Sequence, residues 1–162
     1  MREILFRGKR KDNGKWAEGF YMDYGYINQP FTELGGRFDD TIEVDPETVG
    51  QYTGLTDKNG KKIFEGDIFK FNDEVWESCY TSCETEYDSW NIENYAVVGF
   101  DEETARYDFV KYKYNENSVE ADLHQNHDIE FADFVGELKI IGNIHDNPEL
   151  LKGGAEEWHK VS

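Results

Sequence analysis

Residues 53–71, TGLTDKNGKKIFEGDIFKF, contain a Gly-Lys pair of the kind that binds phosphates in nucleotide-binding loops. A P-loop has four residues between two glycines, then Lys followed by Ser or Thr, and a helix whose N-terminal amides face the phosphates. Here five residues separate Gly54 from Gly60, and Lys61 is followed by a second lysine. The next residues are β-branched and aromatic, which favours a strand over a helix. The pattern therefore predicts a hairpin turn at residues 57–60 and not a nucleotide site.

Two cysteines and two histidines form the best metal-like pattern of the chain. Cys79 and Cys83 stand at C-x₃-C spacing, and His124 and His127 follow as HQNH. Thiolate and imidazole are ligands that suit zinc. Zinc sites usually show tighter spacing such as paired C-x₂-C, and here roughly forty residues of acidic chain separate the two pairs. We leave zinc binding open and assign no residue to catalysis, a cofactor or a metal.

Other catalytic patterns are missing from the sequence. No G-x-S-x-G motif occurs, no nucleophile signature lies beside any of the four histidines, and no D-x-[DN]-x-[DN]-G calcium loop is present. We interpret His145 as a structural or surface histidine. Because catalytic groups assemble in space and not in sequence, a small enzyme, including a metal-dependent nuclease, stays open as an alternative.

The composition predicts a soluble cytoplasmic protein. The chain has 162 residues and no run of about 18 apolar residues, and its first ten residues, MREILFRGKR, lack the apolar centre of a signal peptide. Two cysteines are too few for a disulfide scaffold, so we expect them to be reduced. The formal charge of −18 opposes binding to a phosphate backbone. We expect no direct nucleic-acid partner and no membrane partner.

The charge is distributed unevenly along the chain. Residues 1–16 hold six basic residues against two acidic ones, whereas residues 71–105 hold ten Asp or Glu and no Lys or Arg. The basic end of one subunit could meet the acidic segment of another, which would give a homo-oligomer. Compensation within one chain, or a solvated acidic surface, are the simpler alternatives.

The elements that must position these residues are mostly strands. An apolar segment at residues 3–9 and the dipeptide Asn13-Gly14 predict a first hairpin with a type I′ turn. Its return strand, residues 16–23, alternates between two faces that both carry aromatic rings. These faces hold Trp16, Glu18, Phe20 and Met22 on one side and Ala17, Gly19, Tyr21 and Asp23 on the other. Residues 24–31 continue or pair with this strand, and the adjacent glycines of residues 34–40 indicate a loop.

Further hairpins are predicted in the middle and at the end of the chain. The 57–60 turn is followed by a tight turn at residues 65–67 and a strand that offers Ile68, Phe69 and Phe71 for packing. Residues 95–101 and 105–114 form a third hairpin around the turn DEET. Residues 138–144 form a strand in which Gly142 favours a bulge.

Short helices separate some of these strands. Asp45 can cap a helical turn that starts at Pro46, and Asn147 and Pro148 repeat this arrangement. Residues 127–137, HDIEFADFVGE, fit either a short helix, with Ile129, Ala132 and Phe131 or Phe134 inward, or an extended segment. The tail, with Gly-Gly at residues 153–154, is loosely held unless Trp158 docks.

Three blocks of the sequence resemble a known family. MREILFRG at the start, QYTGLTDKNGKKIFEGDIFKF in the centre and IGNIHDNPELL at the end are similar to the YopX family of phage and prophage proteins. The resemblance spans about residues 1–151 and implies phage origin, a cytoplasmic protein made in the host, and a β-rich fold. It carries over no catalytic residue. The stretch from residue 72 to about 134 shows none of these phrases.

Together these observations predict a mainly β protein with a few short helices. We expect several hairpins that form a small barrel-like or bent sheet core, as one domain at residues 1–151 with an acidic insertion at about 72–134 and a C-terminal tail at 152–162. The function we favour is a non-enzymatic, self-associating protein-interaction module with a host or phage protein as a further partner. An acidic mimic of DNA that occupies a host DNA-binding protein, and a small enzyme, are the alternatives.

Overall fold

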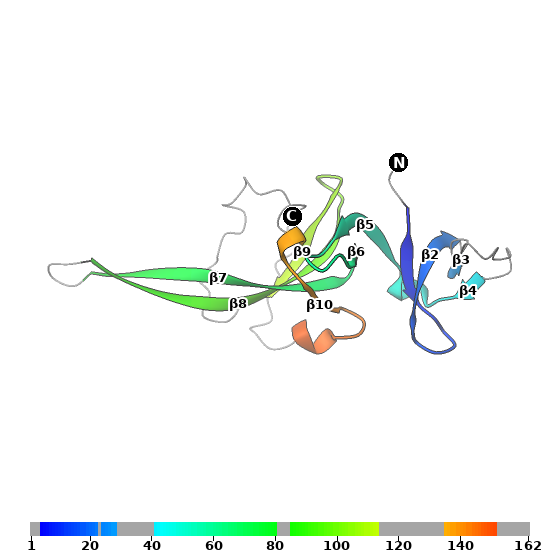
Figure 1. The fold of residues 1–162 in the computed structure, drawn as a ribbon, viewed down its shortest axis with the longest axis horizontal. Helices are drawn as coiled ribbons and strands as arrows, with labels where there is room; N and C mark the ends of the chain where they lie inside the picture. Colours follow the sequence, from blue (N-terminus) through cyan, green and yellow to red (C-terminus); the bar gives the residue numbers. More distant parts are fainter. Residues whose placement is uncertain (1–3, 23, 29–40, 81–84, 114–134, 152–162) are drawn as a thin grey trace.

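The predicted mainly β fold is confirmed by a computed structural model, which describes residues 4–22, 24–28, 41–80, 85–113 and 135–151 (Figure 1). All strand pairs in these ranges are antiparallel. The first sheet contains, in spatial order, β4 (Thr41–Glu43), β3 (Tyr26–Asn28), β2 (Trp16–Met22), β1 (Phe6–Lys9), β5 (Gly50–Thr56) and β6 (Lys62–Phe64). The second contains β10 (Ile140–Asn143), β7 (Asp67–Tyr80), β8 (Thr85–Asp101) and β9 (Arg106–Lys113).

The first predicted hairpin is formed by β1 and β2, but its turn differs from the prediction. A type I′ turn needs positive φ at two consecutive residues. Here Gly14 has a φ of 68°, whereas Asn13 does not have a positive φ. The amide of Arg10 donates to the oxygen of Lys15, so four residues form the loop and only the glycine takes the left-handed conformation. The type I′ prediction is wrong because loop length, and not the Asn-Gly dipeptide alone, selects the turn.

The first sheet curls, as the bent-sheet prediction required. Beyond β1, Arg10 forms a bridge with Val44, which directly follows β4. The amide of Lys11 donates to the oxygen of Glu43 in β4 at 3.1 Å. The alternation predicted for β2 is confirmed from Ala17 onward: Ala17 and Gly19 are buried and Tyr21 is half-buried, whereas Glu18, Phe20 and Met22 are exposed. The inward face of β2 meets Ile27 and Val44 in a small core.

The predicted 57–60 turn joins β5 to β6. The amide of Asp57 donates to the oxygen of Lys61, and Gly60 has a φ of 78°. A second tight turn then follows at Gly66, whose φ is 82°, and leads into β7. Both turns agree with the sequence prediction, and residues 53–71 therefore form strands joined by tight turns and not a phosphate loop.

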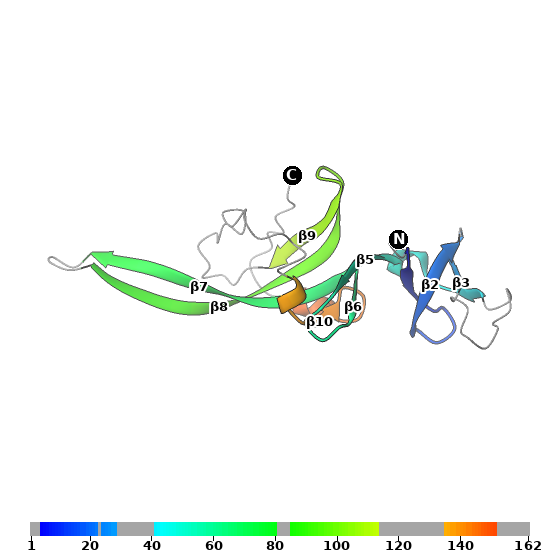
Figure 2. The ribbon, with the colours of Figure 1, turned by 45° about the horizontal axis from the view of Figure 1, so that its top comes forward.

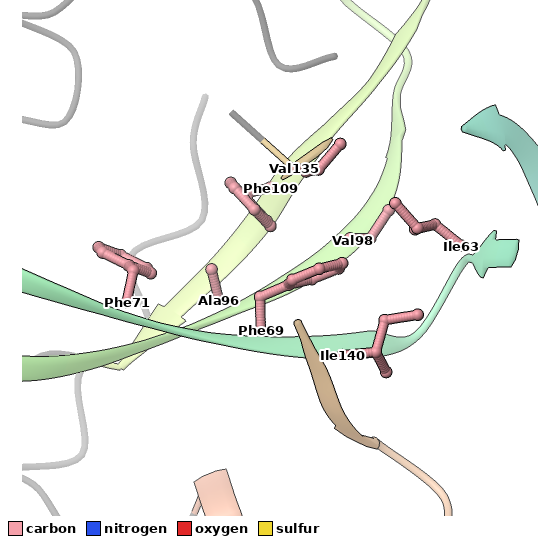
Figure 3. Packing of buried hydrophobic residues seen from close by; sticks show 8 residues of the cluster. All are labelled: Ile63, Phe69, Phe71, Ala96, Val98, Phe109, Val135 and Ile140. Atoms are coloured by element: carbon pink, nitrogen blue, oxygen red, sulfur yellow. The ribbon is translucent and has the colours of Figure 1, made fainter. Parts of the chain in front are cut away.

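The second sheet contains the remaining predicted strands. β8 and β9 form the third hairpin, with Asp101 paired to Arg106 around the turn. The register of β10 against β7 shifts between Ile140 and Gly142, which confirms the predicted bulge. The main core lies on this sheet and includes Ile63 from β6 of the first sheet (Figure 3). Its members are Ile63, Phe69, Phe71, Ala96, Val98, Phe109, Val135 and Ile140.

Strands β7 and β8 extend far beyond this core, which the sequence analysis did not predict. Register pairs continue from Phe71↔Asn94 to Tyr80↔Thr85. These residues fall in the first part of the predicted acidic insertion at about 72–134. The strands project from the rest of the molecule as a long two-stranded ribbon (Figures 1 and 2). We call residues 72–80 and 85–93 the arm.

The short helices are partly as predicted. In η1 (Pro46–Thr48), the Asp45 carboxylate accepts from the amide of Glu47 at 3.1 Å, as expected for a cap. η3 (Pro148–Leu151) begins at Pro148 as predicted, and the side-chain oxygen of Asn147 accepts from the amide of Asn143, so the cap by Asn147 stays a prediction. Residues 135–137 are helical. The rest of the predicted 127–137 element, the 34–40 loop and Trp158 in the tail lie outside the described residues.

Candidate functional site

A buried ion pair lies where the two sheets meet. Arg7 is on β1, and Asp67 is the first residue of β7, directly after the Gly66 turn. Arg7 Nη2 lies 2.7 Å from Asp67 Oδ1, and the two side chains are only 7% and 1% exposed. The Asp67 carboxylate also accepts from the amide of Phe64 at 2.9 Å and from Asn143 Nδ2 at 3.3 Å. Its charge is therefore satisfied by three donors from three segments of the chain.

Two aromatic rings flank the guanidinium of this pair. Arg7 Cζ lies 4.5 Å from the centroid of the Trp16 ring and 4.6 Å from that of Phe64. Trp16 comes from β2, and Phe64 comes from β6. The face of an aromatic ring attracts a cation, most strongly when both are removed from water. The guanidinium is thus fixed by its charge, by its hydrogen bonds and by its packing.

A second, more exposed ion pair extends the network. Lys9 Nζ lies 2.6 Å from Asp146 Oδ1, and Trp16 Nε1 donates to Asp146 Oδ2 at 2.6 Å. Lys9 Nζ also donates to the oxygen of His145 at 3.1 Å. Burial alone would raise the pKa of Asp146, but the hydrogen bonds from Lys9 and Trp16 outweigh it, so this pKa lies below its ordinary value. Asp146 is therefore held as a carboxylate.

His145 occupies this edge of the junction as a structural residue. Its ring centroid lies 6.3 Å from that of Trp16, and its amide donates to Asn143 Oδ1 at 3.0 Å. Burial lowers the pKa of the imidazole, and the positive charges of Lys9 and Arg7 lower it further. We call the residues around the two ion pairs the junction: Arg7, Lys9, Trp16, Phe64, Asp67, Asn143, His145 and Asp146.

The junction joins the three sequence blocks that suggested a family. β1 supplies Arg7 and Lys9, the start of β7 supplies Asp67, the end of β10 supplies Asn143, and the segment after β10 supplies Asp146. The Asp67 carboxylate is buried, and Arg7, Phe64 and Asn143 all donate hydrogen bonds to it. These residues hold the two sheets together, and their arrangement offers no reaction.

The Asp57 carboxylate accepts hydrogen bonds from amides of the Gly-Lys turn. The buried carboxylate of Asp57 accepts from the amides of Asn59 at 2.8 Å, Lys61 at 2.9 Å and Ile140 at 3.2 Å. Amides that a phosphate would need are thus used by a side chain of the same turn. Burial raises the pKa of Asp57, but the three amides outweigh this effect and hold the pKa below its ordinary value. The carboxylate also connects the turn to β10.

The arm is the feature that sequence reasoning missed. β10 pairs with β7 at residues 67–69, and the pairing of β9 with β8 reaches no farther along the ribbon than Tyr95. Within the described ranges, the arm therefore has no third strand on either side. Its residues include six Asp or Glu and no Lys or Arg. Among its register pairs, Glu77 stands directly opposite Asp88.

The basic N-terminal segment is neutralised within the chain. Four of its six basic residues pair with a carboxylate of the same molecule. These pairs are Arg7–Asp67, Lys9–Asp146, Arg10–Asp12 and Lys11–Glu43. The structure thus favours compensation within one chain over the intermolecular role that the uneven charge suggested.

Only one of the four candidate zinc residues lies in the described part of the chain. Cys79 lies on β7 in the arm, opposite Glu86, whereas Cys83, His124 and His127 lie outside the described residues. In the described part of the chain, no three His, Cys, Asp or Glu side chains are grouped to hold a metal ion. Zinc binding by this set stays a prediction. None of the helices described here is long and apolar enough to cross a membrane.

These features define a strand-rich protein in which segments distant in sequence meet in one buried ionic network, with a long ribbon projecting from it. The chain belongs to the YopX family: the family's sequence model, described as YopX protein, matches residues 5–152. Among solved structures, the crystal structure of protein EF1440 from Enterococcus faecalis matches with a TM-score of 0.44 and 22% identity. That match covers 94% of this chain and 100% of the other. A comparison with curated proteins finds no match.

Proposed function

We propose that this protein is a phage-encoded, non-enzymatic protein-interaction module that acts in the host cytoplasm and self-associates. The observation that carries the proposal is the arm. A two-stranded ribbon has only marginal stability in water, because it has few partners for its exposed backbone groups. A row of unpaired amides and carbonyls along an edge strand is also a template for another chain. An element of this kind is suited to contact with a partner.

The charged groups of the folded body support a role without catalysis. The strongest candidates for chemistry, Asp67, Asp57 and Asp146, each use their carboxylate to hold two or more segments of the chain together. Perturbed carboxylates at an active site are normally left accessible to a substrate. The lowered pKa values of Asp57 and Asp146 result from hydrogen bonds that these carboxylates accept within the fold.

The oligomeric state of the full-length chain tests the proposal. We expect size-exclusion chromatography with light scattering at micromolar concentration to give a mass of two or more chains. A matched variant replaces residues 73–92 by Asn-Gly, which keeps every core residue of β7 and β8 and removes the arm. We expect this variant to fold and to be monomeric. A monomeric wild-type protein at both low and high salt would contradict the proposal.

A second candidate function is an acidic mimic of DNA, and one observation favours it. From residue 71 to residue 105 the chain has ten Asp or Glu and no Lys or Arg. Projected on an extended ribbon, such a sequence could occupy the basic surface of a host DNA-binding protein. If the protein mimics DNA, it should capture basic host proteins at low salt. High salt should release them, because it weakens such contacts as it weakens contacts to DNA phosphates. Capture of the same proteins at low and high salt would count against it.

A further inference from the structure

We infer that the arm of one copy docks on a cluster of three lysines of a neighbouring copy. The lysine cluster consists of Lys58, Lys61 and Lys139. This inference rests on the proposed self-association and specifies the two surfaces that meet. It replaces the contact suggested by the uneven charge of the sequence, in which the N-terminal segment supplied the positive side.

The lysine cluster is fixed in place by the β5–β6 turn. Lys58 and Lys61 lie on either side of the tip of this turn, and both are exposed. The amide of Lys58 donates to the oxygen of Leu138 at 3.0 Å, and Asp57 accepts from the amide of Ile140 at 3.2 Å. These bonds place exposed Lys139 beside the turn. Three ammonium groups are thus gathered on one corner of a protein with a charge of −18.

These lysines differ from most basic residues of the N-terminal segment in their ion pairing. None of the three forms an ion pair with another side chain of the described ranges, whereas four N-terminal basic residues do. A cation that already has a carboxylate beside it gains little from a second one, because its charge is already largely compensated. The lysine cluster is therefore the better docking site for an acidic element.

The arm has a matching excess of negative charge. Glu77 and Asp88 are register partners, so the sequence places an acidic residue on both strands at this point of the arm. Ammonium groups are complementary to this negative charge. The arm also contains Trp76 and Trp90, and an aromatic ring is a favourable partner for an ammonium group. Two arms packed against each other would instead bring carboxylates together, which disfavours that alternative.

The contact must join two molecules. The arm projects away from the body, and the β5–β6 turn lies beside the base of the ribbon (Figures 1 and 2). A chain therefore cannot place the far part of its arm on its own lysine cluster. Because two different surfaces meet, each copy offers one arm and one lysine cluster. A reciprocal exchange of arms gives a two-fold dimer, whereas contacts that are not reciprocal close into rings or continue as filaments.

A pair of matched substitutions tests the inference. Lys61 and Lys15 each follow Asn-Gly in a hairpin turn, both are exposed, and each amide donates to an Asp or Asn side chain at 2.9 Å. We expect Lys61→Glu to weaken self-association at least about tenfold, which corresponds to about 1.4 kcal/mol. We expect Lys15→Glu, with the same change of charge, to leave it within about twofold. Equal effects of the two substitutions would overturn the inference.

A charge exchange separates a lost contact from a lost fold. One variant carries Glu77→Lys and Asp88→Lys in the arm, and the other carries Lys58→Glu and Lys61→Glu in the lysine cluster. We expect each to be monomeric alone and the mixture to associate, because each variant then meets a surface of opposite charge. A mixture that stays monomeric while wild-type chains associate would overturn the inference alone. Wild-type chains that never associate would overturn the proposed self-association as well.

Discussion

Removal of the Asp67 carboxylate is the most informative perturbation of the fold. Asp67→Ala leaves the Arg7 guanidinium, whose side chain is only 7% exposed, without its counter-charge, and leaves the amide of Phe64 without its acceptor. Loss of one partner of a buried ion pair costs about 3–5 kcal/mol. Small proteins are stable by about 5–15 kcal/mol, so this single change should remove about a fifth or more of the free energy of unfolding.

Urea denaturation followed by tryptophan fluorescence and circular dichroism measures this loss. The matched control is Asp12→Ala, which removes a carboxylate at the same 2.7 Å distance from a guanidinium, that of Arg10, but at an exposed position. We expect a small or undetectable change there, since exposed pairs contribute little. A double substitution of Arg7 and Asp67 by apolar residues should cost less than the sum of the single changes. If Asp67→Ala is no worse than Asp12→Ala, the junction does not hold the sheets together.

Three further predictions follow from the same structure. Gly19→Ala should be strongly destabilising in a urea titration, because the added Cβ would overlap the backbone oxygen of Asn28 on the neighbouring strand. The lowered pKa of Asp57 means that its stabilisation is complete above about pH 4 and is lost as the pH falls through the folded-state pKa. Asp57→Asn should therefore flatten the acid limb of a stability–pH curve. The pKa of His145, measured by NMR titration, should lie below 6.5, and Lys9→Met should raise it. A His145 pKa at or above 6.5 would contradict the positive surroundings that we describe.

Local sequence signals predicted the hairpins well. The 57–60 turn, the Gly66 corner and the bulge of β10 depend on a few neighbouring residues, and all three are present. The same kind of signal failed at Asn13-Gly14, where the loop has four residues and only Gly14 has a positive φ.

The junction and the arm could not be predicted from the sequence. Arg7 and Asp67 are sixty positions apart, and nothing in the sequence near either residue says that they meet. An arginine inside the apolar segment at residues 3–9 was the available signal that it would need a buried partner. The arm follows Phe71, which belongs to the main core, and its sequence shows no regular alternation of apolar and polar residues. The division into a domain, an insertion and a tail stays a prediction.

Zero-length cross-linking of mixed isotope-labelled copies tests the central claim most directly. Unlabelled and fully ¹⁵N-labelled chains are mixed, treated with a carbodiimide that joins lysines to carboxylates, and analysed by mass spectrometry. We predict mixed-label cross-links that join Lys58, Lys61 or Lys139 to Asp or Glu residues of the arm. Cross-links of the arm that occur only within single-label chains, or mixed-label links that avoid the arm and the lysine cluster, would contradict the account.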